Sequence, residues 1–298
     1  MLSKVIILVS ILLISLVSQV IAVSTIPGED SKLTAMKLDP SIVKQKHSDA
    51  KNKYLVAKNN YITLKNEFLT ARSRWNLAKS IENKDLVVEK GKKFLTGSIN
   101  KITKQLQHIR TRVETSEFID NSEELIDELD LHITILKNSQ ETVLEVETQE
   151  ELIAVSKTVK GEWKKTRLIV KRHAGFVLVS KAKAGIAKAR KISGKIDLKI
   201  QNLEDAGFDI TEFNERLELV KANLINAESS LKEAQEIYAG IYDSETAGAE
   251  FIEGSSKIKK TKSILKKTYA EIKDIVLKLR TMSTPSELPE NSVPRGVI

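Results

Sequence analysis

The chain of 298 residues contains no cysteine, so no disulfide stabilises the fold and its stability must come from buried helix faces. Aromatic residues make up only 5% of the chain, and proline occurs only five times. No stretch shows the alternation of apolar and polar residues that is typical of a β-strand. These absences predict an all-α fold.

Motifs that carry chemistry are also missing. The sequence has no glycine-rich phosphate loop, no GxSxG nucleophile motif, no EF-hand spacing and no HExxH pair. The four histidines fall on four different predicted helices, where each is more typical of a helix interface than of a catalytic or metal site. They are His47, His108, His132 and His173. We therefore predict that the protein is not an enzyme and has no catalytic residue, no metal ligand and no cofactor.

The first residues have the pattern of an export signal. Lys4 precedes an apolar run at residues 5–17, which is followed by small residues at the spacing that a signal peptidase reads. We predict a cleaved signal peptide at residues 1–22. The alternative is an uncleaved N-terminal anchor, because residues 5–23 come close to the roughly 20 apolar residues that span a bilayer. Both alternatives place the protein outside the cytoplasm, secreted or associated with the cell envelope.

Composition and helical period divide the remaining chain into four parts. A short segment without apolar period forms a flexible leader, two helical regions follow, and a proline-containing tail is expected to be disordered. The boundaries are 23–39 for the leader, 40–146 for the N-terminal helical region, 147–282 for the C-terminal helical region and 283–298 for the tail.

Apolar residues recur in steps of four and three along most of the chain. In the first such seam an aromatic ring stands at every seventh position, namely Tyr54, Tyr61, Phe68 and Trp75, with alanines between the rings. A period near 3.5 keeps one face of a long helix against partner helices. We predict a first helix over residues 40–82, whose rings form packing core rather than a ligand site.

Turn and capping signals divide the next part of the chain into further helices. Residues 83–85 predict a turn, after which a second helix ends near Ser116. Asn121 with Glu124 resembles a capping box, in which the two side chains bond to free backbone N–H groups at a helix start. This pair is expected to open a third helix.

Similar signals define the last three helices. Thr148 with Glu151 forms a better capping box and opens the fourth helix. Gly175 lies within that helix and predicts a kink or break, because glycine costs about 1 kcal/mol relative to alanine inside a helix. Asp209 with Glu212 is expected to open the fifth helix.

A turn at residues 240–244 is expected before the sixth helix. The predicted fold class is thus all-α: an elongated bundle of about six long antiparallel helices with heptad seams.

Formal charge alternates in sign along these helices, although the whole chain carries a net charge of +8. The third and fifth helices are acidic and their neighbours are basic, so antiparallel neighbours would present opposite charges. The fourth helix carries a basic stripe at steps of three and four. Its members are Lys157, Lys160, Lys164, Arg167 and Lys171.

Two interpretations of this stripe are open. It is either a solvated face that complements the acidic third helix, or a contact for a polyanion or an anionic membrane surface. Export argues against nucleic acid as the partner.

Two segments resemble uncharacterised secreted α-helical, coiled-coil-like proteins of archaea. Residues 156–175 read SKTVKGEWKKTRLIVKRHAG, with Trp-Lys inside a basic helix. Residues 203–240 contain an AGFD turn before a capped helix and an alanine-rich heptad that ends in Tyr-Ala-Gly. The resemblance extends more weakly over residues 71–113. It implies a secreted helical protein and transfers no functional residue.

The expected function is that of a non-enzymatic extracytoplasmic scaffold or protein-interaction module. The expected partner is another helical protein or a second copy of the chain, which would pack against the charged faces or seams. One alternative is an extracytoplasmic chaperone or carrier, which requires an exposed apolar cleft. The other is a binder of anionic surfaces through the basic stripe.

Overall fold

The computed structural model describes residues 39–283, and these residues form α-helices and no strand. This confirms the all-α prediction. The predicted signal peptide and nearly all of the predicted leader and tail lie outside the described residues. The helices are α2 (Pro40–Leu77), α3 (Ile81–Glu114), α4 (Ser122–Glu145), α5 (Gln149–Asp205), α6 (Thr211–Ala239) and α7 (Ala247–Ser283).

The turn between α2 and α3 lies nearer the N-terminus than the predicted turn at residues 83–85. Helix α2 ends at Leu77, and Ser80 caps α3 by accepting a hydrogen bond from the backbone N–H of Asn83 (3.2 Å). The Asn83 amide donates back to the carbonyl of Ala78 (2.9 Å). Because Ser80 provides the cap, residues 83–85 belong to the first turn of α3, and the predicted boundary was wrong.

The predicted capping boxes have different outcomes. At the start of α5, the Thr148 hydroxyl accepts from the N–H of Glu151 (3.2 Å), and the Glu151 carboxylate accepts from the N–H of Thr148 (3.0 Å). This box is confirmed. The Asn121 side chain makes no capping hydrogen bond at the start of α4. The Asp209 carboxylate accepts from the backbone N–H of Thr211, the first residue of α6, and not from that of Glu212. Those two boxes were wrong, although both helices exist.

Helix α5 ends in a Schellman motif around Gly207. The N–H of Phe208 donates to the carbonyl of Leu203 (3.0 Å), and the N–H of Gly207 donates to that of Glu204 (2.8 Å). Gly207 has a φ of +82°, a conformation that glycine adopts without steric cost. The motif reverses the chain, so that α6 returns antiparallel to α5, with Lys221 3.6 Å from Asp197.

Helices α3 and α4 pack with the N-terminal half of α5 around one apolar core. Helix α4 runs antiparallel to α3, where Arg110 pairs with Asp130. Helix α5 runs parallel to α3, because Leu152 lies at Gly91 and Ser180 at Ser116. The core includes Ile99, Leu106, Val113, Leu129, Leu136, Val143, Val159 and Val170.

Three of the four rings in the aromatic seam of α2 pack against α3, whereas Trp75 is half-buried and contacts Lys79, so the predicted core is confirmed only in part. The ring of Phe68 stacks on that of Phe94 with centroids 5.4 Å apart, and Tyr61 contacts the same ring at 5.6 Å. Tyr61 is buried, whereas Tyr54 and Phe68 are half-buried. The seam therefore covers one side of α3 but leaves its own edges accessible to solvent.

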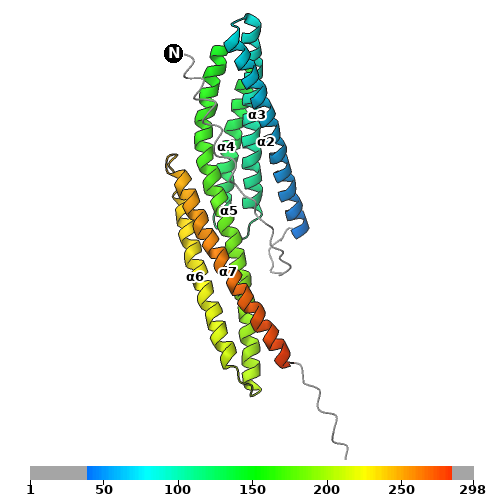
Figure 1. The fold of residues 1–298 in the computed structure, drawn as a ribbon, viewed down its shortest axis with the longest axis vertical. Helices are drawn as coiled ribbons and strands as arrows, with labels where there is room; N and C mark the ends of the chain where they lie inside the picture. The colour runs from blue at the N-terminus through cyan, green and yellow to red at the C-terminus, as the bar shows by residue number, and fades with distance from the viewer. Residues whose placement is uncertain (1–38, 284–298) are drawn as a thin grey trace, which may run out of the picture. The chain divides into compact units, whose positions relative to one another are not determined.

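The C-terminal half of α5 packs with α6 and α7 around a second stretch of core. Figure 1 shows α5 passing beside α4 and then beside α6 and α7. Ion pairs between Glu233 and Lys257 and between Glu212 and Lys278 align α6 antiparallel to α7. The core includes Ile186, Ile196, Ile200, Leu217, Val220, Leu224, Leu231, Ile258, Leu265 and Ile275.

Tyr238 of α6 joins the two stretches of core. Its side chain is fully buried, and its ring lies against the backbone of Gly175 in α5 and of Gly254 in α7. The Tyr238 hydroxyl lies 3.1 Å from that of Ser255. Helix α5 continues through Gly175 without interruption, so the predicted break was wrong. Glycine stands there because any side chain would occupy the volume of the ring.

We expect Gly175→Ala to destabilise the protein by about 1 to 3 kcal/mol, because the new Cβ overlaps the buried Tyr238 ring. Gly161→Ala is the matched control, since Gly161 lies in the same helix and has no neighbouring atom within 4 Å of the added Cβ. The control should gain about 0.4 to 1 kcal/mol from reduced unfolded-state entropy. Urea unfolding of both variants measures the difference, and equal stability of the two would contradict the packing role of Gly175.

Candidate functional site

The five residues of the predicted basic stripe lie on one side of α5. Lys157 and Lys164 are exposed, and Lys160, Arg167 and Lys171 are half-buried. None of the five forms an ion pair with a carboxylate within residues 39–283, whereas neighbouring Lys165 and Arg172 both do. The structure therefore leaves the positive charge of the stripe without a paired anion in the described part of the chain.

The acidic helix α4 does not cover this stripe. Its Glu128 pairs with Arg172 and His173, on a different face of α5, and its Asp130 pairs with Arg110 of α3. The expected intramolecular pairing between α4 and α5 thus exists, but it involves Arg172 and His173 rather than the stripe. The predicted complementarity between the stripe and α4 was wrong, whereas the interpretation of the stripe as a solvated face stays a prediction.

The contact around Glu128 is largely buried. His173 is fully buried, its Nε2 lies 3.2 Å from a Glu128 carboxylate oxygen, and its Nδ1 lies 2.9 Å from the carbonyl of Ile169. Desolvation alone would raise the pKa of Glu128, but His173 and Arg172 outweigh it and lower the pKa to about 2. Glu128 is therefore ionised at all physiological pH values and holds α5 in a fixed rotation against α4.

A second row of cations on α2 was missed by the sequence analysis. Lys51, Lys58 and Lys65 stand seven residues apart, so they lie on one flank of the helix next to the aromatic seam. None of them forms an ion pair within the described residues. The two carboxylates of α2 are engaged elsewhere, since Glu67 pairs with Lys90 and Asp49 accepts from Gln45. The spacing of seven in the sequence is the signal that identifies this row.

Lys101 of α3 links the two rows of cations. Its ammonium lies 4.2 Å from the ring centroid of Tyr61 in α2 and 6.0 Å from that of Trp163 in α5. Lys58 and Lys65 are close enough to Lys101 to lower its pKa by repulsion. In sequence, Tyr61 stands between Lys58 and Lys65, and Trp163 stands between Lys160 and Arg167, so Lys101 lies between parts of the two rows. We call them the basic face: Lys51, Lys58, Lys65, Lys157, Lys160, Lys164, Arg167 and Lys171.

Lys101 itself is an unusual buried cation. Only 4% of the residue is exposed, and it has no ion-pair partner among residues 39–283. Desolvation, reinforced by the charges of Lys58 and Lys65, lowers its pKa to about 8. The aromatic ring of Tyr61 provides the compensating contact, through a cation–π interaction.

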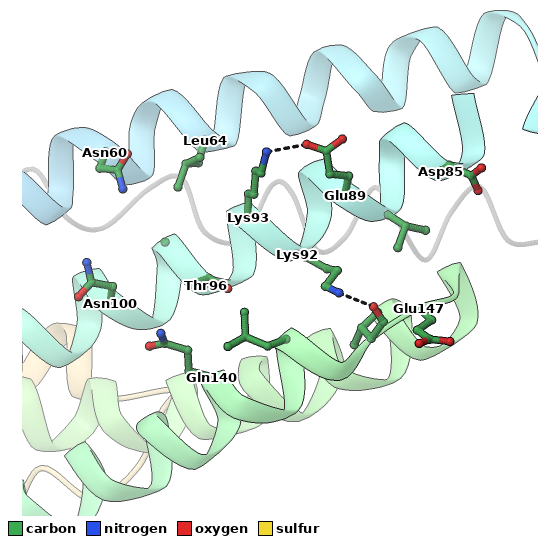
Figure 2. A pocket seen from close by; sticks show the side chains of 14 residues that line it. Asn60, Leu64, Asp85, Glu89, Lys92, Lys93, Thr96, Asn100, Gln140 and Glu147 are labelled. Carbon is green, nitrogen blue, oxygen red and sulfur yellow. Dashed lines mark hydrogen bonds and ion pairs between the residues drawn. The ribbon is translucent and has the colours of Figure 1, made fainter. Parts of the chain in front are cut away.

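An open groove of about 950 Å³ lies on the other side of α3, between α2 and α4 (Figure 2). Figure 2 shows the side chains of Asn60, Asn100 and Gln140 at one end of it. In the middle of the groove, Lys92 donates to the carbonyl of Val146 (2.6 Å) and Lys93 pairs with Glu89 (2.6 Å), and Asp85 and Glu147 lie at the other end.

The apolar part of the groove is small. Leu64 and Leu144 contribute apolar surface, and Val88 is almost entirely buried. The groove is lined by amide and charged side chains as well as apolar ones, and its exposed apolar surface is small for a chaperone client.

The four histidines do not converge on a metal site. His173 and His132 lie near Glu128, whereas His47 and His108 lie beside Arg112 of α3. Among residues 39–283 there is no group of three or more His, Asp or Glu side chains with metal-binding geometry. No helix within that range is both long and apolar enough to cross a membrane.

We expect Lys101→Met to stabilise the protein by about 1 to 3 kcal/mol near pH 7, because it removes a buried unpaired charge and retains the side-chain volume. The pKa of Lys101 is lower in the folded chain than in the unfolded chain. Its penalty is therefore complete below pH 8 and fades as the pH rises toward 10.5.

Chemical denaturation of wild type and variant at pH 7 and pH 10 measures this effect. The stability gap should shrink at the higher pH, and a gap that is independent of pH would show that Lys101 does not carry a buried charge. Lys157→Met, at an exposed position of the basic face, is the control and should change stability by less than about 0.5 kcal/mol.

Comparison of the chain with protein-family models, with curated proteins and with solved structures gave no significant match. The resemblance to secreted helical proteins of archaea therefore remains a prediction. The function must be argued from the geometry of the basic face and its surroundings.

Proposed function

We propose that the protein is a non-enzymatic helical interaction module that acts outside the cytoplasm and binds an anionic membrane surface through its basic face. One observation carries the proposal. Eight cations form two rows, three on α2 and five on α5, and none of them forms an ion pair with a carboxylate within residues 39–283. Structural ion pairs do not account for this charge, whereas an external anion would.

The electrostatics favour an extended anionic surface over a single small ligand. Lys51 and Lys65 are about 21 Å apart along α2, as are Lys157 and Lys171 along α5, at 1.5 Å per residue. Each Lys or Arg close to an anionic bilayer contributes roughly 1 kcal/mol of binding free energy. Several cations acting together give stable association at low salt. This attraction declines as salt shortens the Debye length from about 30 Å at 0.01 M to about 10 Å at 0.1 M.

Apolar residues beside the cations support a bilayer as the partner. Leu55 and Ile62 are 40% and 47% exposed, and their spacing of seven places them on the same flank of α2 as the lysines. Basic residues bordered by exposed apolar side chains are typical of helices that lie in the membrane interface. An acidic protein surface would satisfy the lysines but would not require Leu55 and Ile62 to be exposed.

The carrier function is less well supported. Its candidate binding region is the groove of Figure 2, which is lined by amide and charged side chains as well as apolar ones and has little exposed apolar surface. A scaffold that binds a second helical protein, or a second copy of the chain, is the remaining alternative. The vesicle experiment below separates it from the membrane proposal, because a protein partner gives no binding to pure lipid.

We expect the protein to bind vesicles of phosphatidylglycerol and phosphatidylcholine at low salt and to leave them at high salt. Changing Lys157, Lys160, Lys164, Arg167 and Lys171 to Gln should lower the lipid partition coefficient by at least tenfold, because several favourable contributions of roughly 1 kcal/mol each are lost. Vesicle sedimentation measures both effects, and circular dichroism checks that the variant remains helical.

A control variant separates the basic face from net charge. Lys232, Lys259, Lys260, Lys266 and Lys267 are exposed on α6 and α7. Changing these five residues to Gln removes the same charge and should leave most of the vesicle binding intact. Equal loss in both variants would mean that net charge alone drives binding, and no wild-type binding at low salt would refute the proposal.

A further inference from the structure

A second group of cations lies where α2, the C-terminal end of α3 and the middle of α5 meet. Arg112 Nε donates to His108 Nε2 (3.1 Å), and His47 Nε2 lies 2.6 Å from the Thr115 hydroxyl. The charge of Lys181 on α5 acts on both histidines. Four nitrogen-bearing side chains from three helices thus face one region.

The charges in this region repel one another. Desolvation and then Arg112 are the largest causes that lower the pKa of His47, and the same two causes lower that of His108 to about 4. The side chain of Lys181 reaches solvent, yet partial desolvation, Arg112 and Lys262 of α7 lower its pKa to about 8. Within the described residues no carboxylate contributes to these shifts, so no internal anion compensates the group.

Hydroxyl groups border the same region. The Thr115 hydroxyl donates to the carbonyl of Thr111 (2.8 Å), and the hydroxyls of Ser116 and Ser180 are in contact. Carbonyls at the C-terminus of α3 offset part of the positive charge, because a helix C-terminus favours nearby cations. They cannot serve as an ionic partner for a guanidinium, an ammonium and two imidazoles together. Cationic nitrogens are the groups that bind phosphate-type oxyanions.

We propose that His47, His108, Arg112 and Lys181 form a binding site for a phosphate-type oxyanion, either inorganic phosphate or the phosphate of a lipid headgroup. Arg112 supplies the permanent charge, Lys181 is charged below its pKa of about 8, and the two imidazoles add N–H donors when they are protonated. None of these four residues belongs to the basic face, although Lys51 of that face also acts on His108, and the site does not rest on the proposed membrane function. A bound anion would join α2, α3 and α5 at the level where α7 approaches α5.

The site should bind more tightly as the pH falls. Both histidines are neutral at pH 7.5 without ligand, and a bound anion raises their pKa values and favours protonation. Proton uptake on binding follows by linkage, so affinity rises from pH 8 to pH 5.5. The charged and titratable groups that act on the site are His47 and Lys51 of α2, His108 and Arg112 of α3, Lys181 of α5 and Lys262 of α7.

Proton NMR of the imidazole C–H signals tests the site, because the whole chain has only four histidines. Inorganic phosphate at pH 6, added at constant ionic strength, should shift the signals of His47 and His108. The signals of His132 and His173, which lie by Glu128, should not move. A separate titration with sulfate, whose charge does not change between pH 8 and pH 5.5, should give at least a tenfold gain in affinity over that range.

Variants assign the site to these residues. Lys181→Gln should weaken phosphate binding by about tenfold, the usual loss when one hydrogen bond to a charged group is removed. Lys232→Gln on α6 removes the same charge from an exposed position and should leave the affinity unchanged. Lys181 reaches solvent, so its substitution should not impair folding, and the wild-type histidine signals provide a readout that does not depend on any variant.

Comparing several ligands shows whether the site binds free phosphate or the phosphate of a lipid headgroup. Shifts of His47 and His108 with inorganic phosphate support a free oxyanion. Shifts that occur only with glycerol phosphate or with phosphatidylglycerol vesicles, and not with phosphatidylcholine vesicles, support a lipid headgroup. If phosphate, glycerol phosphate and both vesicles act no differently from chloride, or if Lys181→Gln binds phosphate as well as wild type does, the site does not exist.

Discussion

The rotation of α5 about its own axis is the constraint on which the rest of the structure depends. Two independent contacts fix it. The apolar seam must face the α3–α4 core, and Arg172 and His173 must reach Glu128 on α4. With both contacts made, the five stripe cations of α5 form no ion pair with α4. The unpaired stripe of α5 is thus a consequence of satisfying the core and the contact with Glu128.

Helix α5 belongs to both stretches of core. Its N-terminal half completes the core with α3 and α4, and its C-terminal half packs with α6 and α7. The ring of Tyr238 lies against two glycine backbones, which places the α6–α7 turn beside the middle of α5. The same segment of α5 carries Lys181 and Ser180, so the anion site and this junction lie within about two helical turns of each other.

Local patterns predicted much of the fold, because heptad seams and capping signals depend on neighbouring residues. The box at Thr148 was predicted correctly, since both partners lie within four residues. The break at Gly175 was predicted wrongly, because the reason for that glycine is Tyr238, distant in sequence. The lysines of α5 were identified from their spacing. Contacts between helices could not be predicted in this way, because they depend on how the helices align in three dimensions. Examples are the proximity of Lys101 to Lys58 and Lys65, and that of Arg112 to Lys181.

Lysine acetylation footprinting on vesicles tests the central claim most directly, because it reads each surface of the native chain in one experiment. With phosphatidylglycerol vesicles at low salt, Lys51, Lys157 and Lys164 should become protected, whereas exposed Lys232 of α6 and Lys267 of α7 should react as fast as in solution. The protection should disappear at high salt. Uniform protection of all exposed lysines, or protection confined to α6 and α7, would contradict the assignment of the binding surface to α2 and α5.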